Sequence, residues 1–295
     1  MKILVLGGTG TVGSQVVREL MDAGSDVSVL TRDEENAAKL PSGVKAEIGD
    51  LRDPSTIRSV FNGKDGVFLL NAVSQTETNE GLMAVNGLTR AGVKKVVYVS
   101  VPGIEDAPHL PHFGSKMPIE YAIRKSGVPF TILKPNNFYQ NDYWFKDVIT
   151  GYGVYPQPLG GAGVSRVDVR DIAEVARAAF IGDGQNGESY HLAGPEALTG
   201  ERTAMIWSEA LGKDVVYGGD DMDVWEEQAK TMLPDWMAFD FRLMYEYFQE
   251  AGLRATDEEL ERLTEIIGHE PRRYEDFVTE TAAAWTGGSS ERTAA

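Results

Sequence analysis

The sequence predicts an α/β fold, a Rossmann-like doubly wound parallel sheet joined to a smaller, helix-rich C-terminal substrate domain. Strand-like and helix-like segments alternate through the first 134 residues, which is typical of a parallel sheet with helices on both faces. Glycines occupy positions 7, 8, 10 and 13, between the first strand-like and the first helix-like run. After Pro135 the alternation stops, and residues 199–285 are helix-rich and hold most of the tryptophans.

Each expected strand is a short apolar run bounded by turn residues. The first helix carries Val12, Val16, Val17 and Leu20 on one stripe and has Gly24 at its end, as an amphipathic helix requires. The crossovers between successive strands should be right-handed. Strands are expected over Lys2–Leu6, Asp26–Leu30, Val44–Ile48, Gly66–Leu70, Lys95–Ser100 and Val128–Leu133, and helices over Thr11–Ala23, Asp33–Leu40, Pro54–Phe61, Thr76–Ala91 and Ser115–Lys125.

The change of composition after Pro135 predicts the domain organisation. Residues 1–150 should form the dinucleotide-binding domain, and residues 164–182, with a helix over Val167–Phe180, should pack back onto it. Residues 135–165 are rich in Asn, Gly and aromatic residues and are expected to be mainly loop. Residues 151–285 are expected to form the smaller substrate-binding cap, and residues 286–295 a disordered tail.

Composition excludes several classes of function. The chain has 295 residues and no cysteine, so disulfides, thiolate metal sites and cysteine nucleophiles are excluded. Its 28 basic residues face 45 acidic ones, for a net charge of −17, which disfavours direct nucleic-acid binding. No apolar run approaches the roughly 20 residues of a membrane span, and no signal peptide is apparent. We therefore expect a cytoplasmic protein with a small-molecule substrate and no membrane partner, and its surface helices are compatible with a homodimer.

The glycines at positions 7–13 are explained best by a nucleotide. They fit G-x-G-x-x-G at 8, 10 and 13, directly after a strand and at the start of a helix, which is the setting of a dinucleotide-binding fingerprint. Glycine permits the tight turn and the close approach of a pyrophosphate, which the helix N-terminus then attracts. We expect cofactor contacts from Gly7, Thr9, Gly10, Thr11, Val12 and Gly13.

Arg32 indicates which nicotinamide cofactor is bound. An acidic residue at the end of the second strand binds the ribose 2′-hydroxyl of NAD, whereas an arginine accommodates the 2′-phosphate of NADP. Arg32 lies at this position, although the acidic run of residues 33–35 follows it at once. NADP(H) is therefore expected rather than NAD(H), with an ordinary surface arginine as the alternative interpretation.

Several segments together resemble the NmrA-like branch of the atypical short-chain dehydrogenase/reductase superfamily. The likeness extends from Met1 to about Trp285. The resemblance implies a Rossmann-like domain and a small substrate domain. The segments that carry it are GGTGTVG at 7–13, TR at 31–32, GDLRD at 49–53, VVYVS at 96–100, KMPIEYAIRKSGVPFTILKPNNFYQN at 116–141, VDVRDIAEVARAAF at 167–180 and GHEPRRYEDFV at 268–278.

The resemblance also implies further cofactor contacts after successive strands. All of them follow parallel strands, where ligands bind in open α/β sheets. Alternatively, Asp50 caps a turn with Asp53 and Asn71 is an ordinary loop residue. The implied contacts are Asp50 and Leu51 near the adenine, Asn71 and Ala72 near the ribose, Ser100 at the end of the fifth strand, and Pro135, Asn137 and Phe138 beside the nicotinamide.

The catalytic residues of the wider superfamily are only partly present. The one Tyr-x-x-x-Lys match, Tyr121 with Lys125, stands at the far end of its helix and is interpreted as coincidental. The register HFGSKMPIE at 112–120 instead gives Lys116 and Glu120, four residues apart on one helix face, with His112 in place of the Tyr.

Lys116 would hold the nicotinamide ribose, with an ordinary solvated lysine as the alternative. His112 is the candidate proton donor, because an unperturbed imidazole has a pKa of about 6.5, although Pro118 places it in a loop before the helix.

These residues favour an NADPH-dependent reductase of a planar conjugated acceptor, such as a quinone or an enone. Phe138, Tyr139, Asn141 and Trp144 are expected to line the substrate site, with packing at the domain interface as the alternative. The absence of the superfamily Tyr keeps open a catalytically silent sensor of the nicotinamide ratio that regulates a partner protein, and disfavours an isomerase. No metal is expected, because the four histidines are scattered or lack supporting carboxylates.

Overall fold

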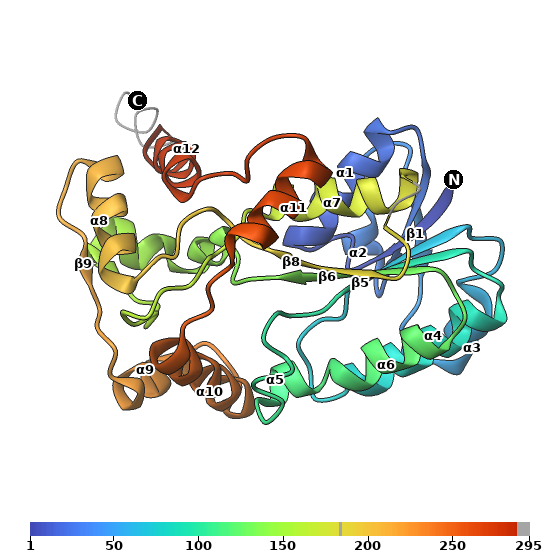
Figure 1. Ribbon diagram of the computed structural model, residues 1–295, viewed down its shortest axis with the longest axis horizontal. Helices are drawn as coiled ribbons and strands as arrows, with labels where there is room; N and C mark the ends of the chain where they lie inside the picture. Colours follow the sequence, from blue (N-terminus) through green and yellow to red (C-terminus); the bar gives the residue numbers. More distant parts are fainter. Residues whose placement is uncertain (183–184, 288–295) are drawn as a thin grey trace. The chain divides into compact units, whose positions relative to one another are not determined.

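The computed structural model describes residues 1–182 and 185–287 of the chain (Figure 1). They form two compact units. Unit 1 comprises Met1–Pro135, Val169–Leu192 and Arg262–His269, and unit 2 comprises Asn136–Asp168, Ala193–Glu261 and the residues from Glu270 onward. The chain thus enters unit 2 at Asn136, earlier than the sequence-based boundary at residue 150. Of the expected tail over 286–295, residues 288–295 lie outside the described residues.

Unit 1 contains a parallel sheet whose strand order is β3-β2-β1-β4-β5-β6-β8. Val5 in β1 pairs with Val29 of β2 on one side and Phe68 of β4 on the other. The order reverses between β1 and β4, as in a doubly wound fold, so the predicted fold class is confirmed. The strands are β1 (Lys2–Leu6), β2 (Asp26–Thr31), β3 (Lys45–Ile48), β4 (Gly66–Leu69), β5 (Lys95–Val99), β6 (Phe130–Pro135) and β8 (Glu188–Leu192).

Helices cover both faces of this sheet (Figure 1). The apolar stripe of the first helix is buried, with Val16, Val17 and Leu20 at 0% exposure. Asp33 and Asp53 cap the N-termini of α2 and α3 through their side chains. On one face α1 (Thr11–Asp22) packs against α7 (Val169–Ile181), and on the other lie α3 (Pro54–Ser59), α4 (Glu77–Arg90) and α6 (Met117–Lys125); α2 (Glu34–Ala37) and α5 (Pro111–Gly114) are single turns.

Strand β8 is the main element of unit 1 that sequence reasoning missed. Its segment ESYHL is five residues long, and only Tyr190 and Leu192 are buried. A continuous apolar run is the usual signature of a strand buried on both faces, and β8 lacks it because it forms the edge of the sheet. Its pairing with β6, from Thr131↔Glu188 to Pro135↔Leu192, fixes its place.

Unit 2 is built mainly from helices. Residues 139–155, expected to be loop, contain the 3₁₀ segment η1 (Tyr139–Phe145), the π-helical turn η2 (Val148–Tyr152) and the short strand β7 (Val154–Tyr155), which pairs in parallel with β9 (Val216–Tyr217). Thr199 caps α8 and Asp221 caps α9. The helices are α8 (Gly200–Leu211), α9 (Met222–Ala229), α10 (Asp235–Ala251), α11 (Asp257–Ile267), whose second half lies in unit 1, and α12 (Tyr274–Gly287).

None of the helices in the described parts of the chain is long and apolar enough to cross a membrane.

Candidate functional site

The candidate site of unit 1 is the carboxyl edge of its parallel sheet. The helices that connect successive parallel strands run from this edge back toward the start of the next strand. The N-termini of α1, α4 and α6 therefore lie at the carboxyl edge too. Loops at this edge carry the ligand-binding residues of doubly wound sheets, above all where the strand order reverses. Here the reversal lies between β1 and β4, beside the glycine loop and the residues that follow Leu69.

The glycine loop has the geometry of an anion cradle. Gly7 has a φ of +73°, a left-handed conformation that favours glycine. A Cβ on Gly13 would lie 2.1 Å from the Gly7 carbonyl oxygen, so α1 packs against the loop more closely than any side chain allows. Gly7, Thr9, Gly10 and Thr11 are exposed, whereas Gly13 is buried. The loop therefore presents backbone to solvent at the start of α1, where the helix dipole attracts negative charge.

Arg32 and Asp50 line a hollow of about 430 Å³ at the ends of β2 and β3, together with Gly49. The Asp50 carboxylate accepts three bonds from the Arg52 guanidinium: from Nε at 3.0 Å to Oδ1 and 3.2 Å to Oδ2, and from Nη2 at 2.6 Å to Oδ2. These bonds, with a smaller effect from the Arg32 charge, lower the pKa of Asp50 to about 2. The predicted turn between Asp50 and Asp53 is also present, since the Asp53 amide donates to the Asp50 carbonyl.

Asn71 fits a polar ligand better than a core position. Its side chain is 6% exposed, and neither amide atom has a hydrogen-bond partner among the described residues. A buried amide without partners is costly, so a ligand that hydrogen-bonds to it would be favoured. The neighbouring Ala72 is exposed, whereas the Leu51 side chain packs into the core of the sheet. The residues present therefore fit a dinucleotide, although the Leu51 side chain is not available to contact it.

Lys116 and Glu120 lie at this edge but do not pair with each other. Lys116, the residue before α6, is 4% exposed and forms an ion pair with Glu77 in the first turn of α4. Glu120 accepts a bond from the Ser100 hydroxyl and lies 3.6 Å from the Lys134 Nζ. The predicted ribose-binding lysine is therefore present as a buried, paired ammonium, and Glu77 is the residue that sequence reasoning missed.

Tyr98 is a buried phenol whose hydroxyl is influenced by the charges of Glu77 and Glu120. Tyr98 is fully buried in β5, and its hydroxyl has no hydrogen-bond partner among the described residues. Burial, followed by the charges of Glu77 and Glu120, raises its pKa well above 10. Tyr98 is therefore a neutral phenol at physiological pH.

His112 differs from the expectation in two ways. It lies on the short helix α5 rather than in a loop. Burial, with a smaller effect from the Lys116 charge, lowers the pKa of His112 to about 3, far below the value near 6.5 that made it attractive. The ring is therefore neutral near pH 7, so His112 does not act there as an imidazolium acid.

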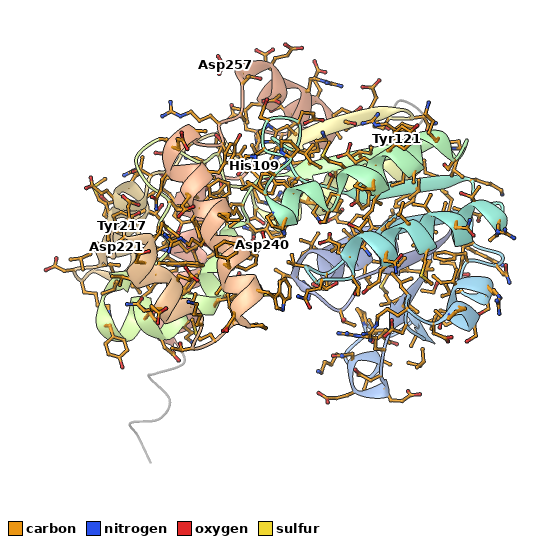
Figure 2. All side chains as sticks on the ribbon, turned by 90° about the horizontal axis from the view of Figure 1, so that it is seen from below. His109, Tyr121, Tyr217, Asp221, Asp240 and Asp257 are labelled. Atoms are coloured by element: carbon orange, nitrogen blue, oxygen red, sulfur yellow. The ribbon has the colours of Figure 1, made fainter. Side chains whose placement is uncertain are left out.

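Tyr121 has no place at the edge that carries these groups. It is 66% exposed on α6, and the Lys125 ammonium lies 5.7 Å from the centre of its ring (Figure 2). Lys125 is the last residue of α6, at the opposite end of the helix from Lys116. A surface cation–π contact describes this pair better than a catalytic one.

The residues expected beside the nicotinamide belong to two parts of the chain. Pro135 ends β6 in unit 1, and the next residues enter unit 2. In unit 2 the Arg166 guanidinium fixes this segment, donating from Nε to the Asn137 side chain at 2.9 Å and from Nη2 to the Phe138 carbonyl at 2.6 Å. Both Asn137 and Phe138 remain partly exposed.

The expected substrate wall is only partly available. Tyr139 is fully buried, its ring packs on Tyr274 and Phe277, and its hydroxyl donates to a backbone carbonyl at 3.0 Å. A side chain in the core of unit 2 cannot line an open site, so this assignment was wrong. Asn141 is partly exposed and Trp144 is 64% exposed.

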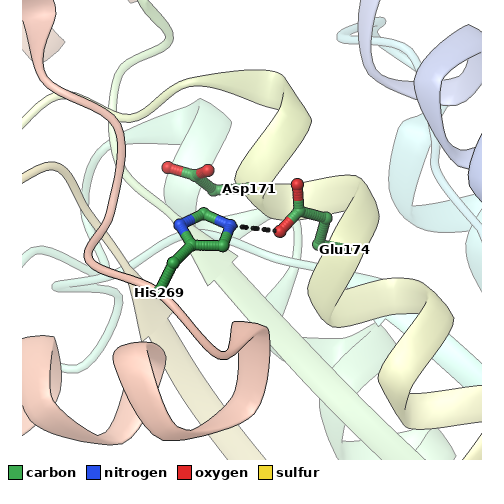
Figure 3. A group of neighbouring side chains, drawn as sticks. All are labelled: Asp171, Glu174 and His269. Carbon is green, nitrogen blue, oxygen red and sulfur yellow. Dashed lines mark hydrogen bonds and ion pairs between the residues drawn. The ribbon is translucent and has the colours of Figure 1, made fainter.

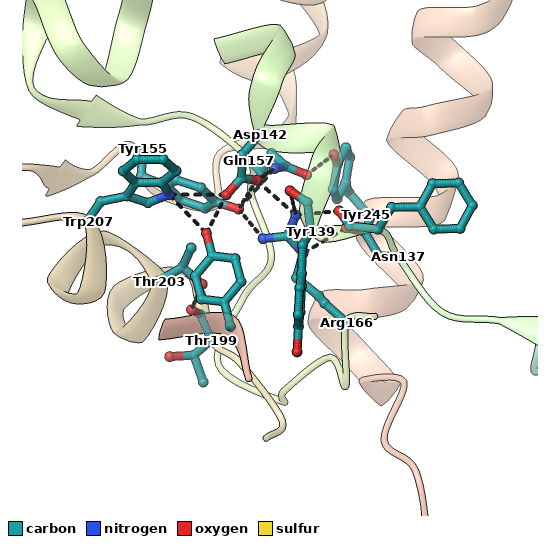
Figure 4. Close-up of polar contacts among 12 residues, drawn as sticks. Asn137, Tyr139, Asp142, Tyr155, Gln157, Arg166, Thr199, Thr203, Trp207 and Tyr245 are labelled. Carbon is teal, nitrogen blue, oxygen red and sulfur yellow. Dashed lines mark hydrogen bonds and ion pairs between the residues drawn. The ribbon is translucent and has the colours of Figure 1, made fainter. Parts of the chain in front are cut away.

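A buried ion pair organises unit 2 around these residues. Arg166 and Asp142 are both 0% exposed, and their Nη2 and Oδ1 atoms are 2.8 Å apart (Figure 4). The Asp142 carboxylate also accepts bonds from Gln157, Tyr155, Trp207 and Tyr274. Sequence reasoning missed this pair because its members are 24 residues apart, and Asp142 lies in the stretch 135–165 that was expected to be loop.

Asp171, Glu174 and His269 form a second polar cluster in unit 1 (Figure 3). Their ligand atoms lie within 4.8 Å of one another, and His269 Nε2 is 2.7 Å from the Glu174 carboxylate. His269 therefore does have supporting carboxylates, contrary to the sequence-based statement. The His–Glu hydrogen bond already occupies one ligand atom of each, so the contacts describe a link between α7 and the second residue after α11.

Comparison with known proteins gives consistent results along the chain. The NmrA-like family model matches residues 1–278. An NAD(P)H azoreductase from Xenophilus azovorans is 32% identical over 291 residues, which cover 96% of this chain and 99% of that protein. A (4-alkanoyl-5-oxo-2,5-dihydrofuran-3-yl)methyl phosphate reductase from Streptomyces griseus is 32% identical over 286 residues, covering 96% and 99%. The crystal structure of the NADPH-dependent quinone oxidoreductase QOR2 from Escherichia coli, complexed with NADPH, superposes with a TM-score of 0.84 at 22% identity, covering 95% and 99%.

Proposed function

Because the chain belongs to the NmrA-like family, we propose that it is an NAD(P)H-dependent oxidoreductase that reduces a planar conjugated small molecule, such as a quinone or an azo compound, by hydride transfer. The observation that carries the proposal is the anion cradle at residues 7–13 beside the unpaired buried amide of Asn71. The reductase names of two relatives that match nearly the whole chain support it.

The cofactor supplies the hydride, and the residues of the chain bind and orient it. The N-terminus of α1 would hold the pyrophosphate, and the Asn71 amide would hydrogen-bond to a ribose. The buried ammonium of Lys116, paired with Glu77, would hold the nicotinamide ribose. Arg166 keeps Asn137 and Phe138 in place within unit 2; these two stay the predicted nicotinamide contacts, and Asn141 and Trp144 the predicted acceptor contacts.

A conjugated acceptor suits this set of residues. His112 is neutral near pH 7, because its pKa is lowered to about 3, and Tyr98 is a phenol with a raised pKa in the core. A ketone is helped by a positioned proton donor beside its oxygen as hydride arrives. A quinone or an azo compound delocalises the negative charge and can take its proton from water, so it requires no dedicated donor.

We further propose that NADPH is preferred to NADH. Arg32 is exposed at the end of β2 and lines the hollow where the adenosine ribose would lie. Its guanidinium would pair with the 2′-phosphate, an interaction for which arginine is well suited. Asp50 lines the same hollow, and its negative charge would repel the 2′-phosphate. The bonds from the Arg52 guanidinium offset part of that charge.

The test measures binding and turnover separately. The purified protein is titrated with NADPH and NADH by fluorescence, and oxidation is then followed at 340 nm with menadione or methyl red as acceptor. We expect NADPH binding with turnover, and in Arg32→Ala a loss of roughly 1–2 kcal/mol in NADPH binding with NADH binding unchanged.

Each adverse result has its own meaning. Binding without turnover on either acceptor would contradict the reductase and favour a sensor of the nicotinamide ratio. No binding of either nucleotide would contradict the dinucleotide site itself. An Arg32→Ala variant that loses affinity for NADH and NADPH equally would contradict only the role of Arg32.

A further inference from the structure

The ion pair between Glu77 and Lys116 is unusual for its burial. The two side chains are 2% and 5% exposed, and they come from the first turn of α4 and the residue before α6. A second contact ties the same two helix starts together, because the Thr78 hydroxyl donates to the Ser115 carbonyl at 2.7 Å. The Ser115 hydroxyl also lies 3.4 Å from the second oxygen of the Glu77 carboxylate.

Stability alone is a weak explanation for this pair. Removing two charges from water costs several kcal/mol for each ion, and well-packed apolar side chains of similar volume often serve a fold as well or better. The pair also lies at the carboxyl edge of the sheet, where doubly wound folds bind their ligands. A buried carboxylate here does two things to a lysine: it holds the ammonium in one position, and it favours the charged form that burial would otherwise disfavour.

We propose that Glu77 is a positioning residue for Lys116, which fixes the ammonium at the carboxyl edge of the sheet and keeps it charged for the nicotinamide ribose. This inference rests on the proposed reductase function and deepens it. Glu77 itself need not touch the cofactor, because its carboxylate faces the ammonium and Ser115.

Several other groups surround the pair, and they determine how it responds to pH. His112 of α5 lies near Lys116 and is neutral above about pH 3, so it adds no charge in the working range. The Tyr98 hydroxyl of β5 stays neutral because burial, followed by the charges of Glu77 and Glu120, raises its pKa. Glu120, one turn along α6, is bound by Ser100 and lies near Lys134. Glu77 is thus the carboxylate that forms an ion pair with Lys116.

The central variant is Glu77→Gln, which keeps the shape of the side chain and removes its charge. We expect kcat/KM for NADPH with menadione to fall about tenfold at pH 7, since a charge-assisted bond that orients the lysine is lost. Without its counter-charge, the buried ammonium gives way to the neutral amine as the pH rises, so kcat/KM should fall about tenfold further between pH 7 and pH 9. The wild-type value should stay nearly constant over that range.

Three further variants show whether the effect passes through Lys116. Glu19→Gln, on α1, removes the same charge from a partly exposed ion pair with Arg177 of α7, 2.9 Å long. It should change kcat/KM less than twofold with no new pH dependence. Glu77→Asp keeps the charge and should keep the flat pH profile even if kcat/KM falls. In a Lys116→Met background, Glu77→Gln should have little further effect on kcat/KM, because residues that act as a unit are not additive.

The possible failures are distinct. If Glu77→Gln has the wild-type pH profile, or if its effect is the same with and without Lys116→Met, the positioning role is refuted while the reductase stands. If Glu77→Asp loses the flat profile as fully as Glu77→Gln, the charge is not what matters and the role is again refuted. If the wild-type protein neither binds NADPH nor reduces menadione, the proposed function fails, and the positioning role fails with it.

Discussion

The buried pair of Arg166 and Asp142 predicts a large loss of stability when one charge is removed. Asp142→Asn keeps the size of the side chain but replaces a carboxylate oxygen with an NH₂ group. The carboxylate accepts bonds from five side chains, among them the Arg166 Nη2 at 2.8 Å and the Trp207 Nε1 at 3.1 Å. The amide therefore leaves Arg166 without its counter-charge and turns a donor toward other donors.

The expected magnitude follows from the burial of the pair. Both side chains are 0% exposed, so no solvent screens the remaining guanidinium. Breaking a buried ion pair by removing one partner costs about 3–5 kcal/mol, most of it the cost of an uncompensated charge. Each buried donor left without an acceptor would add about 1–3 kcal/mol to this cost if it could not move to another acceptor. Because these effects overlap, we expect Asp142→Asn to lower the free energy of unfolding of unit 2 by about 3–5 kcal/mol in total.

Urea unfolding followed by tryptophan fluorescence is the appropriate assay, because Trp207 donates directly to Asp142 and stacks on Trp285 at 4.8 Å. The matched control is Asp223→Asn, which also removes a carboxylate from an arginine. There the Asp223 side chain is 86% exposed and lies 2.6 Å from Arg242, so we expect less than about 1 kcal/mol. A loss below 1 kcal/mol for Asp142→Asn, or one equal to the control, would refute the reasoning.

Two further substitutions test the glycine loop and the buried histidine. Gly13→Ala places a Cβ 2.1 Å from the Gly7 carbonyl oxygen and should destabilise the fold by about 1–3 kcal/mol. In Gly10→Ala the new Cβ would lie 3.3 Å from the same Gly7 carbonyl oxygen, so the unfolding midpoint should stay nearer to that of the wild type. The methyl group would still stand where the backbone approaches the pyrophosphate, so NADPH affinity should fall in a fluorescence titration. Equal unfolding midpoints for the two variants would contradict the packing argument. His112 has a folded pKa of about 3 against about 6.5 when unfolded, so as pH falls through this interval the unfolded chain takes up the proton first and the wild type loses stability. His112→Gln removes this loss, and by pH 5 the difference relative to pH 7 should reach about 2 kcal/mol by urea unfolding; parallel pH profiles would show that the ring is not buried neutral.

Most of unit 1 could be predicted from the sequence because its signals are local. The stripe of Val12, Val16, Val17 and Leu20 on α1 is buried as expected. The glycines at 7–13 predicted the turn between β1 and α1, since only a backbone without a Cβ allows the contact of Gly13 with Gly7. Strand β8 was missed because it forms the edge of the sheet and buries only alternate residues.

At the site, expectation and structure differ for residues whose properties depend on distant neighbours. His112 has a side chain that commonly donates protons near neutral pH, but burial and the Lys116 charge lower its pKa. Tyr139 follows the sixth strand where a substrate contact was expected, yet its ring packs in the core of unit 2. Neither burial nor a neighbouring charge can be read from the spacing of residues along the chain.

The sequence by itself determined the fold class, the glycine loop and the position of Arg32 at the end of β2, because these depend on hydrophobic period, on backbone conformation and on the order of strands and helices. Only the tertiary structure decided which charges meet. Glu77 reaches Lys116 across 39 residues, and Arg166 reaches Asp142 across 24. Such pairs form when packing removes both partners from water, because an unpaired charge in the protein interior costs too much free energy.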